Sequence, residues 1–194
     1  QIAENRGDVL AVVDCSGEAT NRASYVTPYE YSSDNYTTDR AVSVDKVVTQ
    51  IKGRNLNSSY GATYYPWVLT LDTVNNTQIY LPPTGEVVRN IALTDNVSYP
   101  WFAVAGYSRG LVNSIKAAKK LTLDERDTLY KNRINPIATF SDTGTIICGN
   151  KTLQVRESAL DRINVRRLFY QFTKTFCCMA ERYGFCRKRG AAWN

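Results

Sequence analysis

The sequence contains no histidine, and this absence removes the residue that enzymes use most often as a general base. It also excludes a Ser-His-Asp triad and imidazole ligands to a metal ion. The five cysteines are odd in number, and three of them crowd the end of the chain without the spacing of a zinc site. No apolar run approaches the roughly 18 residues that a membrane-spanning helix needs. We therefore expect no catalytic residue, no cofactor, no metal ion and no membrane insertion.

Charge is also scarce over most of the chain. Residues 174–194 hold five basic side chains and one acidic side chain, which is +4 of the net charge of +6. The first 173 residues therefore carry only +2. A nearly neutral body with a basic end gives weak support for a nucleic-acid-binding module. With 43% hydrophobic residues in 194, the chain can still bury a substantial core.

Residues 60–83 organise the predicted fold. Residues 62–71 are nearly all apolar, aromatic or Thr, which predicts a strand covered on both faces. Asn75-Asn76 supplies a turn, and residues 78–81 return as a shorter partner strand. Because Pro66 has no amide hydrogen, it must lie at a bulge or where the strand has no neighbour.

A β-α-β unit is predicted before this hairpin. Residues 9–13 form a short β-branched run typical of a buried parallel strand, and a long surface connection follows. Asp39 is the expected N-cap of the next helix and Gly53 its end. One face of that helix carries four apolar residues at helical spacing, Val44, Val47, Val48 and Ile51.

A second helix is predicted over residues 86–93. Its inward face is expected to carry Val87, Val88, Ile91 and Ala92. Residues 99–106 then return toward the core, and Gly106 to Gly110 forms a corner where the backbone needs glycine. We place a domain boundary at this corner.

Beyond residue 110 the pattern predicts a smaller unit. Thr122 and Glu125 match the two ends of a capping box, and residues 145–148 form a short apolar strand. The last predicted helix has apolar residues at mostly helical spacing, with Arg166, Arg167 and Lys174 largely on its other faces, so it needs a partner surface. The apolar set is Ile163, Val165, Leu168, Phe169, Phe172 and Phe176.

The predicted fold class is α/β, with a mixed sheet flanked by helices and a smaller α+β C-terminal domain. Residues 1–110 form the first domain and residues 111–173 the second. Residues 174–194 are a separate tail. The chain begins with Gln1, and we expect it to be a piece of a longer protein.

Six short strings stand in one order along the chain, and together they closely resemble the tail sheath proteins of contractile bacteriophage tails and related injection machines. The strings begin at Tyr60 (YGATYYPWV), Leu81 (LPPTG), Ala105 (AGYSRG), Ile134 (INPI), Cys148 (CGNKTL) and Ile163 (INVRRL). The resemblance covers roughly residues 5–172. It implies a structural subunit that packs with copies of itself in a helical sleeve around a tail tube. Contraction of such a sleeve drives the tube through the host envelope, without enzymatic chemistry.

The resemblance also implies partners and a location. The partners are copies of the chain, the tail tube protein, and baseplate and tail terminator proteins, without direct nucleic-acid contact. The location is the virion tail sheath, and the host cytoplasm during assembly. Residues 174–194 look like no part of the family, and our hypothesis is that they are a non-native remnant.

Three interpretations of Arg166 and Arg167 stay open. The two residues form a solvated helix face, contact acidic groups on another subunit or the tube, or bind nucleic acid. We take them as candidate residues of a subunit or tube interface. Residues 14–17 (DCSG) follow a strand, where many α/β enzymes place active residues, so a hydrolase-like enzyme is the alternative function and a nucleic-acid-binding module a further one.

Overall fold

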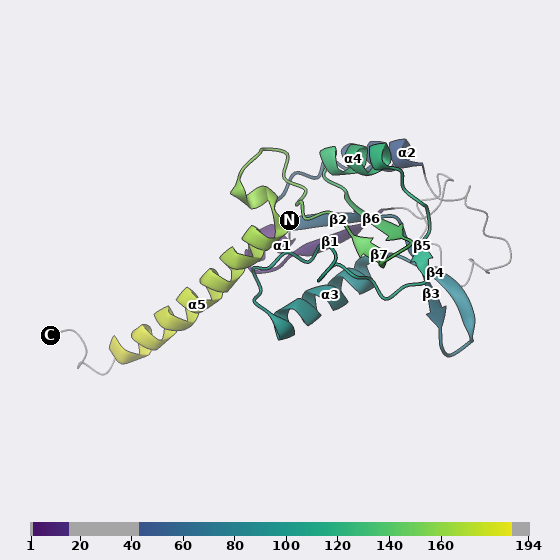
Figure 1. The fold of residues 1–194 in the computed structure, drawn as a ribbon. Coiled ribbons are helices and arrows are strands. Elements are labelled where there is room, and N and C mark those ends of the chain that lie inside the picture. Colours follow the sequence, from purple (N-terminus) through teal and green to yellow (C-terminus); the bar gives the residue numbers. More distant parts are fainter. Residues whose placement is uncertain (1, 16–42, 188–194) are drawn as a thin grey trace.

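A computed structural model describes residues 2–15 and 43–187 of the chain, and two sheets form its core (Figure 1). The larger sheet has four strands in the order β1-β2-β6-β7, in which β1, β2 and β6 are parallel and β7 is antiparallel to β6. Its strands are β1 (Ala11–Asp14), β2 (Gly61–Tyr65), β6 (Asn135–Phe140) and β7 (Gly144–Ile147). The smaller sheet has antiparallel strands in the order β4-β3-β5. These are β3 (Val68–Asp72), β4 (Thr77–Leu81) and β5 (Lys116–Ala117).

Helices cover both faces of the larger sheet. The helices are α1 (Ile2–Arg6), α2 (Val44–Gly53), α3 (Thr84–Val97), α4 (Leu123–Lys131) and α5 (Ile163–Arg187). Figure 1 shows α2 and α4 above the sheet and α3 below it. Two buried clusters match these layers, because Tyr65 packs with residues of α2 and α4, whereas Ala62 and Tyr64 pack with Val87 of α3. The arrangement confirms the predicted α/β class with a mixed sheet.

The prediction of one continuous strand over residues 62–71 is wrong. The chain breaks at Pro66 into β2 and β3, which belong to different sheets. Because proline has no amide hydrogen to donate to a neighbouring strand, the run of backbone hydrogen bonds is interrupted at Pro66. All of β2 is buried, as a strand covered on both faces must be. The hairpin of β3 with β4 is confirmed, and Asn76 in its turn has a φ of 52°.

The β-α-β unit is confirmed, with β1 parallel to β2 and α2 between them. The four apolar residues predicted for the inner face of α2 are all buried. The helix begins at Val44 with Ser43 at the N-cap position, four residues later than the prediction from Asp39. Asp39 and nearly all of the predicted surface connection lie outside the described residues.

Two of the four residues predicted to face inward from helix α3 do so, because Val87 is buried and Ile91 packs against the same buried cluster. Val88 is 51% exposed and Ala92 is exposed. Asn90 and Thr94 are buried instead, because each polar group finds a partner: Asn90 Nδ2 donates to the Leu111 carbonyl at 2.9 Å, and Thr94 Oγ1 donates to the Asn90 carbonyl at 2.8 Å. A buried polar side chain costs little when it is bonded in this way.

The predicted domain boundary near residue 110 does not separate two sheets, because each sheet contains strands from both sides of it. The corner itself is tied to the larger sheet. The Gly106 amide donates to the Ile147 carbonyl, and the Ile147 amide donates to the Gly110 carbonyl, both at 2.8 Å. Gly106 has a φ of +85°, so the predicted need for glycine in this corner is confirmed.

Helix α4 begins with the predicted capping box. The Glu125 amide donates to Thr122 Oγ1 at 3.3 Å, and the Thr122 amide donates to the Glu125 carboxylate at 3.0 Å. Lys119 pairs with the same carboxylate at 2.6 Å. Glu125 therefore stabilises the start of α4.

Candidate assembly surface on the last helix

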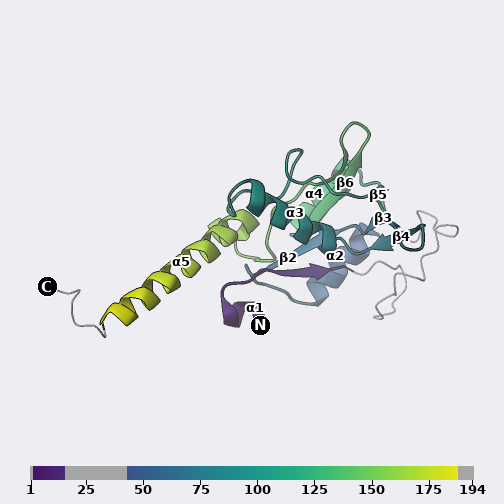
Figure 2. The ribbon, with the colours of Figure 1, turned by 90° about the horizontal axis from the view of Figure 1, so that it is seen from below.

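Helix α5 is attached to the body of the protein only at its beginning. Figures 1 and 2 show its second half extending away from both sheets. The buried residues of α5 are Ile163, Arg166, Arg167 and Tyr170, which share one face of the first two turns. Every residue from Gln171 to Tyr183 is exposed. At 1.5 Å per residue the whole helix is about 38 Å long, and its exposed residues 171–183 extend over about 20 Å of it.

Arg166 joins α5 to the segment that precedes β2. Its guanidinium group donates to the Ser59 hydroxyl and lies 4.1 Å from the centre of the Tyr60 ring. The side chain is only 8% exposed, and among the described residues its Nε has no hydrogen-bond partner. A desolvated cation over an aromatic ring is stabilised by about 2 kcal/mol. Arg166 is thus an intramolecular anchor.

Tyr170 extends the same contact one turn further along the helix. Its ring stacks on Tyr60 with the centroids 6.0 Å apart, and its hydroxyl donates to the Val9 carbonyl at 2.9 Å. Burial raises the pKa of the Tyr170 hydroxyl, so the group stays a neutral donor at neutral pH. Tyr170 therefore links α5 to the segment that leads into β1.

Arg167 joins α5 to α3. Its guanidinium group forms an ion pair with the Asp95 carboxylate in the last turn of α3. The Arg167 side chain is 8% exposed, whereas the Asp95 side chain is 40% exposed. One partner is therefore desolvated and the other still contacts water.

The structure reverses the predicted faces of α5. Arg166 and Arg167 lie on the buried face, and the apolar residues Phe169, Phe172 and Phe176 are 47%, 50% and 66% exposed. The solvated-face interpretation of the two arginines is therefore wrong. The physical reason is that aromatic rings, a hydroxyl and a carboxylate of the same chain receive the two guanidinium groups. A single sequence does not show that these partners, 72 to 107 residues away in the chain, lie next to the two arginines.

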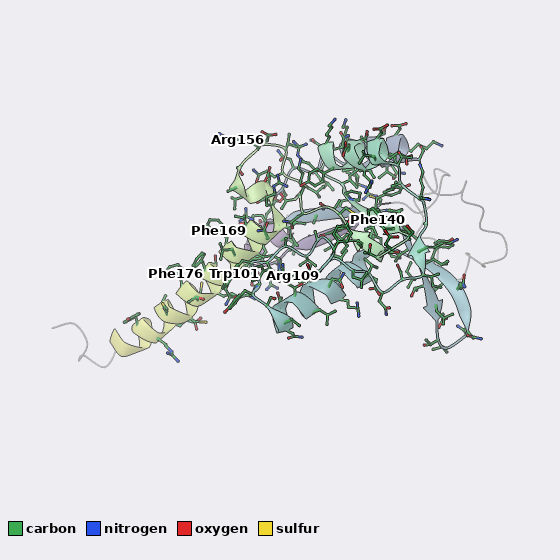
Figure 3. The ribbon with its side chains drawn as sticks, in the orientation of Figure 1. Trp101, Arg109, Phe140, Arg156, Phe169 and Phe176 are labelled. Atoms are coloured by element: carbon green, nitrogen blue, oxygen red, sulfur yellow. The ribbon has the colours of Figure 1, made fainter. Side chains whose placement is uncertain are left out.

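The exposed apolar residues of α5 form one stripe, which we call the α5 stripe. Its members are Phe169, Phe172, Phe176, Met179 and Tyr183, and each is close to half exposed or more. Figure 3 labels Phe169 near the attached start of the helix and Phe176 further along it. The apolar spacing predicted the three phenylalanines, whereas Met179 and Tyr183 fall in the predicted tail. The signal that could have found them is the regular spacing, which continues past residue 174.

A second exposed aromatic group follows α3. The Tyr99 and Trp101 rings stack with centroids 4.7 Å apart and an interplanar angle of 5°, and Arg109 lies 4.3 Å from the centre of the Phe102 ring. Tyr99, Trp101 and Phe102 are each at least 37% exposed. The prediction that this segment returns to the core is confirmed only from Val104, which is buried. Exposed apolar clusters of this kind are typical of surfaces that bind another protein.

The described part of the strand-end segment, Asp14 and Cys15, is held by contacts to neighbouring elements. Cys15 is 3% exposed, and burial raises the pKa of its thiol to about 12, so the thiolate nucleophile is scarce at neutral pH. Thr84 Oγ1 donates to the Asp14 carboxylate, whose pKa is raised because it is partly buried. The Trp67 indole donates to the Cys15 carbonyl at 3.0 Å. These contacts join β1 to its neighbours; Ser16 and Gly17 lie outside the described residues.

The remaining cysteines do not form a described metal site. Cys177 and Cys178 are free and exposed on α5, and the side chain of Cys186 is not described. Within residues 2–15 and 43–187, no three Cys, Asp or Glu side chains are grouped as metal ligands. In the same residues, no helix combines the length and the apolar character needed to cross a bilayer.

Comparison with curated proteins finds relatives of one kind. The chain is 32% identical to the tail sheath protein of Salmonella phage ViI over 174 residues, which is 89% of this chain. It is 37% identical to the tail sheath protein of Vibrio phage KVP40 over 119 residues and 38% identical to that of Enterobacteria phage T4 over 116 residues, each 59% of this chain. The chain is a relative of the phage tail sheath proteins. No family model matches it.

Solved structures of related machines share the fold of this sheath relative. The contracted sheath complex of an extracellular contractile injection system (PVC) matches with a TM-score of 0.60 and 23% identity over 88% of the chain. The contracted baseplate of the anti-feeding prophage matches with a TM-score of 0.56 and 26% identity over 84% of the chain. The chain spans between 17% and 27% of the length of the three curated tail sheath relatives.

Proposed function

We propose that this chain is part of a structural subunit of a contractile tail sheath. The subunits assemble as a helical sleeve around the tail tube, and the sleeve contracts to drive the tube through the host envelope. The similarity to the tail sheath protein of Salmonella phage ViI across 89% of the chain carries the proposal. The fold supports it, because two contracted injection assemblies contain chains of the same architecture.

The mechanical role needs a subunit that keeps its shape while its neighbours change. The described body suits this role because the larger sheet is covered on both faces and its central strand β2 is wholly buried. Close-packed cores resist deformation, so the subunit moves as a rigid body. Each subunit gains a few kcal/mol on reaching the compact arrangement, and the sum over the sleeve drives the stroke.

The partners follow from the same assembly. They are further copies of the subunit, the tail tube protein, and the baseplate and tail terminator proteins at the two ends. The subunit resides in the virion tail after assembly in the host cytoplasm. A contact of Arg166 or Arg167 with another subunit or the tube stays a prediction, and their buried intramolecular partners support an anchoring role as well.

We also propose that the subunit has no enzymatic activity. The buried Cys15 thiol supports this, because its raised pKa leaves the thiolate nucleophile scarce at neutral pH. The curated relatives carry structural names, which agrees with a role in assembly.

Assembly of the full-length parent protein tests the proposal. The parent is expressed with and without its tail tube protein and viewed by electron microscopy. We expect sleeves of regular helical symmetry around the tube, and shorter, wider sleeves after contraction. A full-length parent that stays dispersed while the tube assembles normally would overturn the proposed function.

A further inference from the structure

Charged side chains gather around Tyr130, near the end of α4. Lys151 Nζ lies 4.4 Å from the centre of the Tyr130 ring, and the Arg162 guanidinium group donates to the Tyr130 hydroxyl. An antiparallel backbone bridge pairs Lys151 with Arg162. We call these three residues the Tyr130 cluster. Because its two cations are cross-strand neighbours, they repel each other unless negative charge lies beside them.

The described chain supplies little negative charge to the Tyr130 cluster. Asp161 Oδ1 lies 3.3 Å from Arg162 Nε. Lys151 forms no ion pair with any residue that the structure describes. The Tyr130 ring attracts cations through its negative face, but it has no formal charge. Two cations therefore share one carboxylate.

Further basic side chains lie in the two segments that meet at the cluster. Arg133 follows α4, and its guanidinium group donates to a backbone carbonyl of the loop before α5. Lys131 and Arg156 are exposed in the same two segments, and Figure 3 labels Arg156 on that loop. Residues 130–133 and 151–162 hold five basic and two acidic side chains, which is +3. The whole body before the tail carries only +2, so its positive charge is concentrated here.

We propose that the Tyr130 cluster binds carboxylate groups of an acidic polypeptide segment. The Arg162 guanidinium is a planar fork that can bond a carboxylate twice, and Lys151 adds a point charge beside it. The backbone bridge holds the Cα atoms of the two residues about 5 Å apart, so carboxylates close together in one segment can reach both. The Tyr130 hydroxyl holds the guanidinium in place, so less side-chain entropy is lost on binding.

The surroundings of the ring favour a polypeptide over a nucleic acid. Proteins that bind single-stranded nucleic acid stack the bases on open aromatic faces. Lys151 already covers one face of the Tyr130 ring, and Arg162 bonds to its hydroxyl. The cluster therefore presents charge without an open stacking surface, which suits carboxylates better than bases.

Fluorescence anisotropy of a fluorescein-labelled glutamate-rich peptide tests the proposal with the whole chain. The cluster variant, Lys151→Gln with Arg162→Gln, is expected to bind the peptide about tenfold more weakly than the wild type. The matched control, Lys46→Gln with Lys52→Gln, removes the same charge from exposed positions of α2, and it is expected to bind like the wild type at physiological salt. The basic tail is unchanged in all three proteins, so it contributes equally to each affinity.

A milder variant separates geometry from charge. Tyr130→Phe keeps the ring and every charge but removes the hydroxyl that holds Arg162. It is expected to weaken peptide binding by roughly threefold. Circular dichroism checks that each variant keeps its helix content.

Two results would overturn the proposal. One is an equal affinity of the wild type, the cluster variant and the control variant for the peptide. The other is a single-stranded oligonucleotide of the same charge that binds more tightly than the peptide and loses its binding in the cluster variant, because the site would then take nucleic acid.

An acidic segment can come from the rest of the parent protein or from another chain, and the full-length parent distinguishes these sources. Peptide binding to the 194-residue chain but not to the parent means that the parent covers the cluster itself. Binding to both means that another chain supplies the segment. The inference does not rest on the proposed sheath function, because peptide affinity and the assembly of sleeves are measured separately and either can fail while the other holds.

Discussion

The ion pair between Arg167 and Asp95 predicts an asymmetric response to mutation. Asp95→Ala leaves a guanidinium group buried without its carboxylate, and breaking a fully buried pair in this way costs 3–5 kcal/mol. Because the Asp95 side chain is 40% exposed, part of that interaction is screened by water, and we expect a loss of about 2 kcal/mol. Arg167→Met removes the buried charge and keeps most of the volume. Asp95 then regains water, so the loss is at most about 1 kcal/mol.

Urea denaturation of the three variants measures the free energy of unfolding. The double variant is expected to resemble Arg167→Met alone, so the coupling energy of the pair equals the Asp95→Ala loss of about 2 kcal/mol. Asn96→Ala is the matched control, because it changes the neighbouring exposed residue of α3 without touching the pair. It should alter stability by less than about 0.5 kcal/mol.

Equal losses for the two single variants, with additive losses in the double variant, would refute the reasoning. That result would mean that Arg167 is not desolvated in the isolated chain. It would return Arg167 to the surface and favour the interface role that the sequence suggested.

Three further predictions concern the body of the protein. Gly149→Ala is expected to cost several kcal/mol in the same denaturation assay, because the added Cβ would lie 2.7 Å from the Cα of Asn135; Gly53→Ala, where nothing lies within 4 Å, is the control and should be close to neutral. Thr122→Ala is expected to cost about 1 kcal/mol at neutral pH through loss of the helix cap, and an unchanged midpoint would contradict the capping box. Lys119 and the Thr122 amide hold the pKa of Glu125 below its ordinary value of 4.5, so the stability that its carboxylate contributes is present above pH 4.5 and should be lost as the pH falls through the lowered pKa, as a pH series of melting curves would show.

Several local elements could be predicted because their signals are contained within a few residues. The four apolar residues of α2 define its buried face by spacing alone. The capping box at Thr122 satisfies backbone groups within one turn of helix. The turn at Asn76 needs only a residue that tolerates a positive φ. In each case the physical cause and its effect lie close together in the chain.

Other features depended on partners far away in the sequence. Pro66 divides the predicted strand, but only the sheet order shows that its two halves enter different sheets. The polar residues Asn90 and Thr94 replace Val88 and Ala92 on the buried face of α3 because hydrogen-bond acceptors are available there. The same reason explains the error for Arg166, whose partners lie in the segment before β2.

The sequence by itself determined the secondary structure of most of the body and, through six ordered strings, the resemblance to tail sheath proteins. It also determined the regular spacing of the α5 stripe, since spacing is a property of the sequence alone. Only the tertiary structure decided which face of α5 is buried. Helix α5 packs against the body with the face whose charged side chains find partners there. Those partners lie far away in the sequence, so the spacing within the helix does not reveal them. The buried arginines therefore leave the apolar face of α5 exposed.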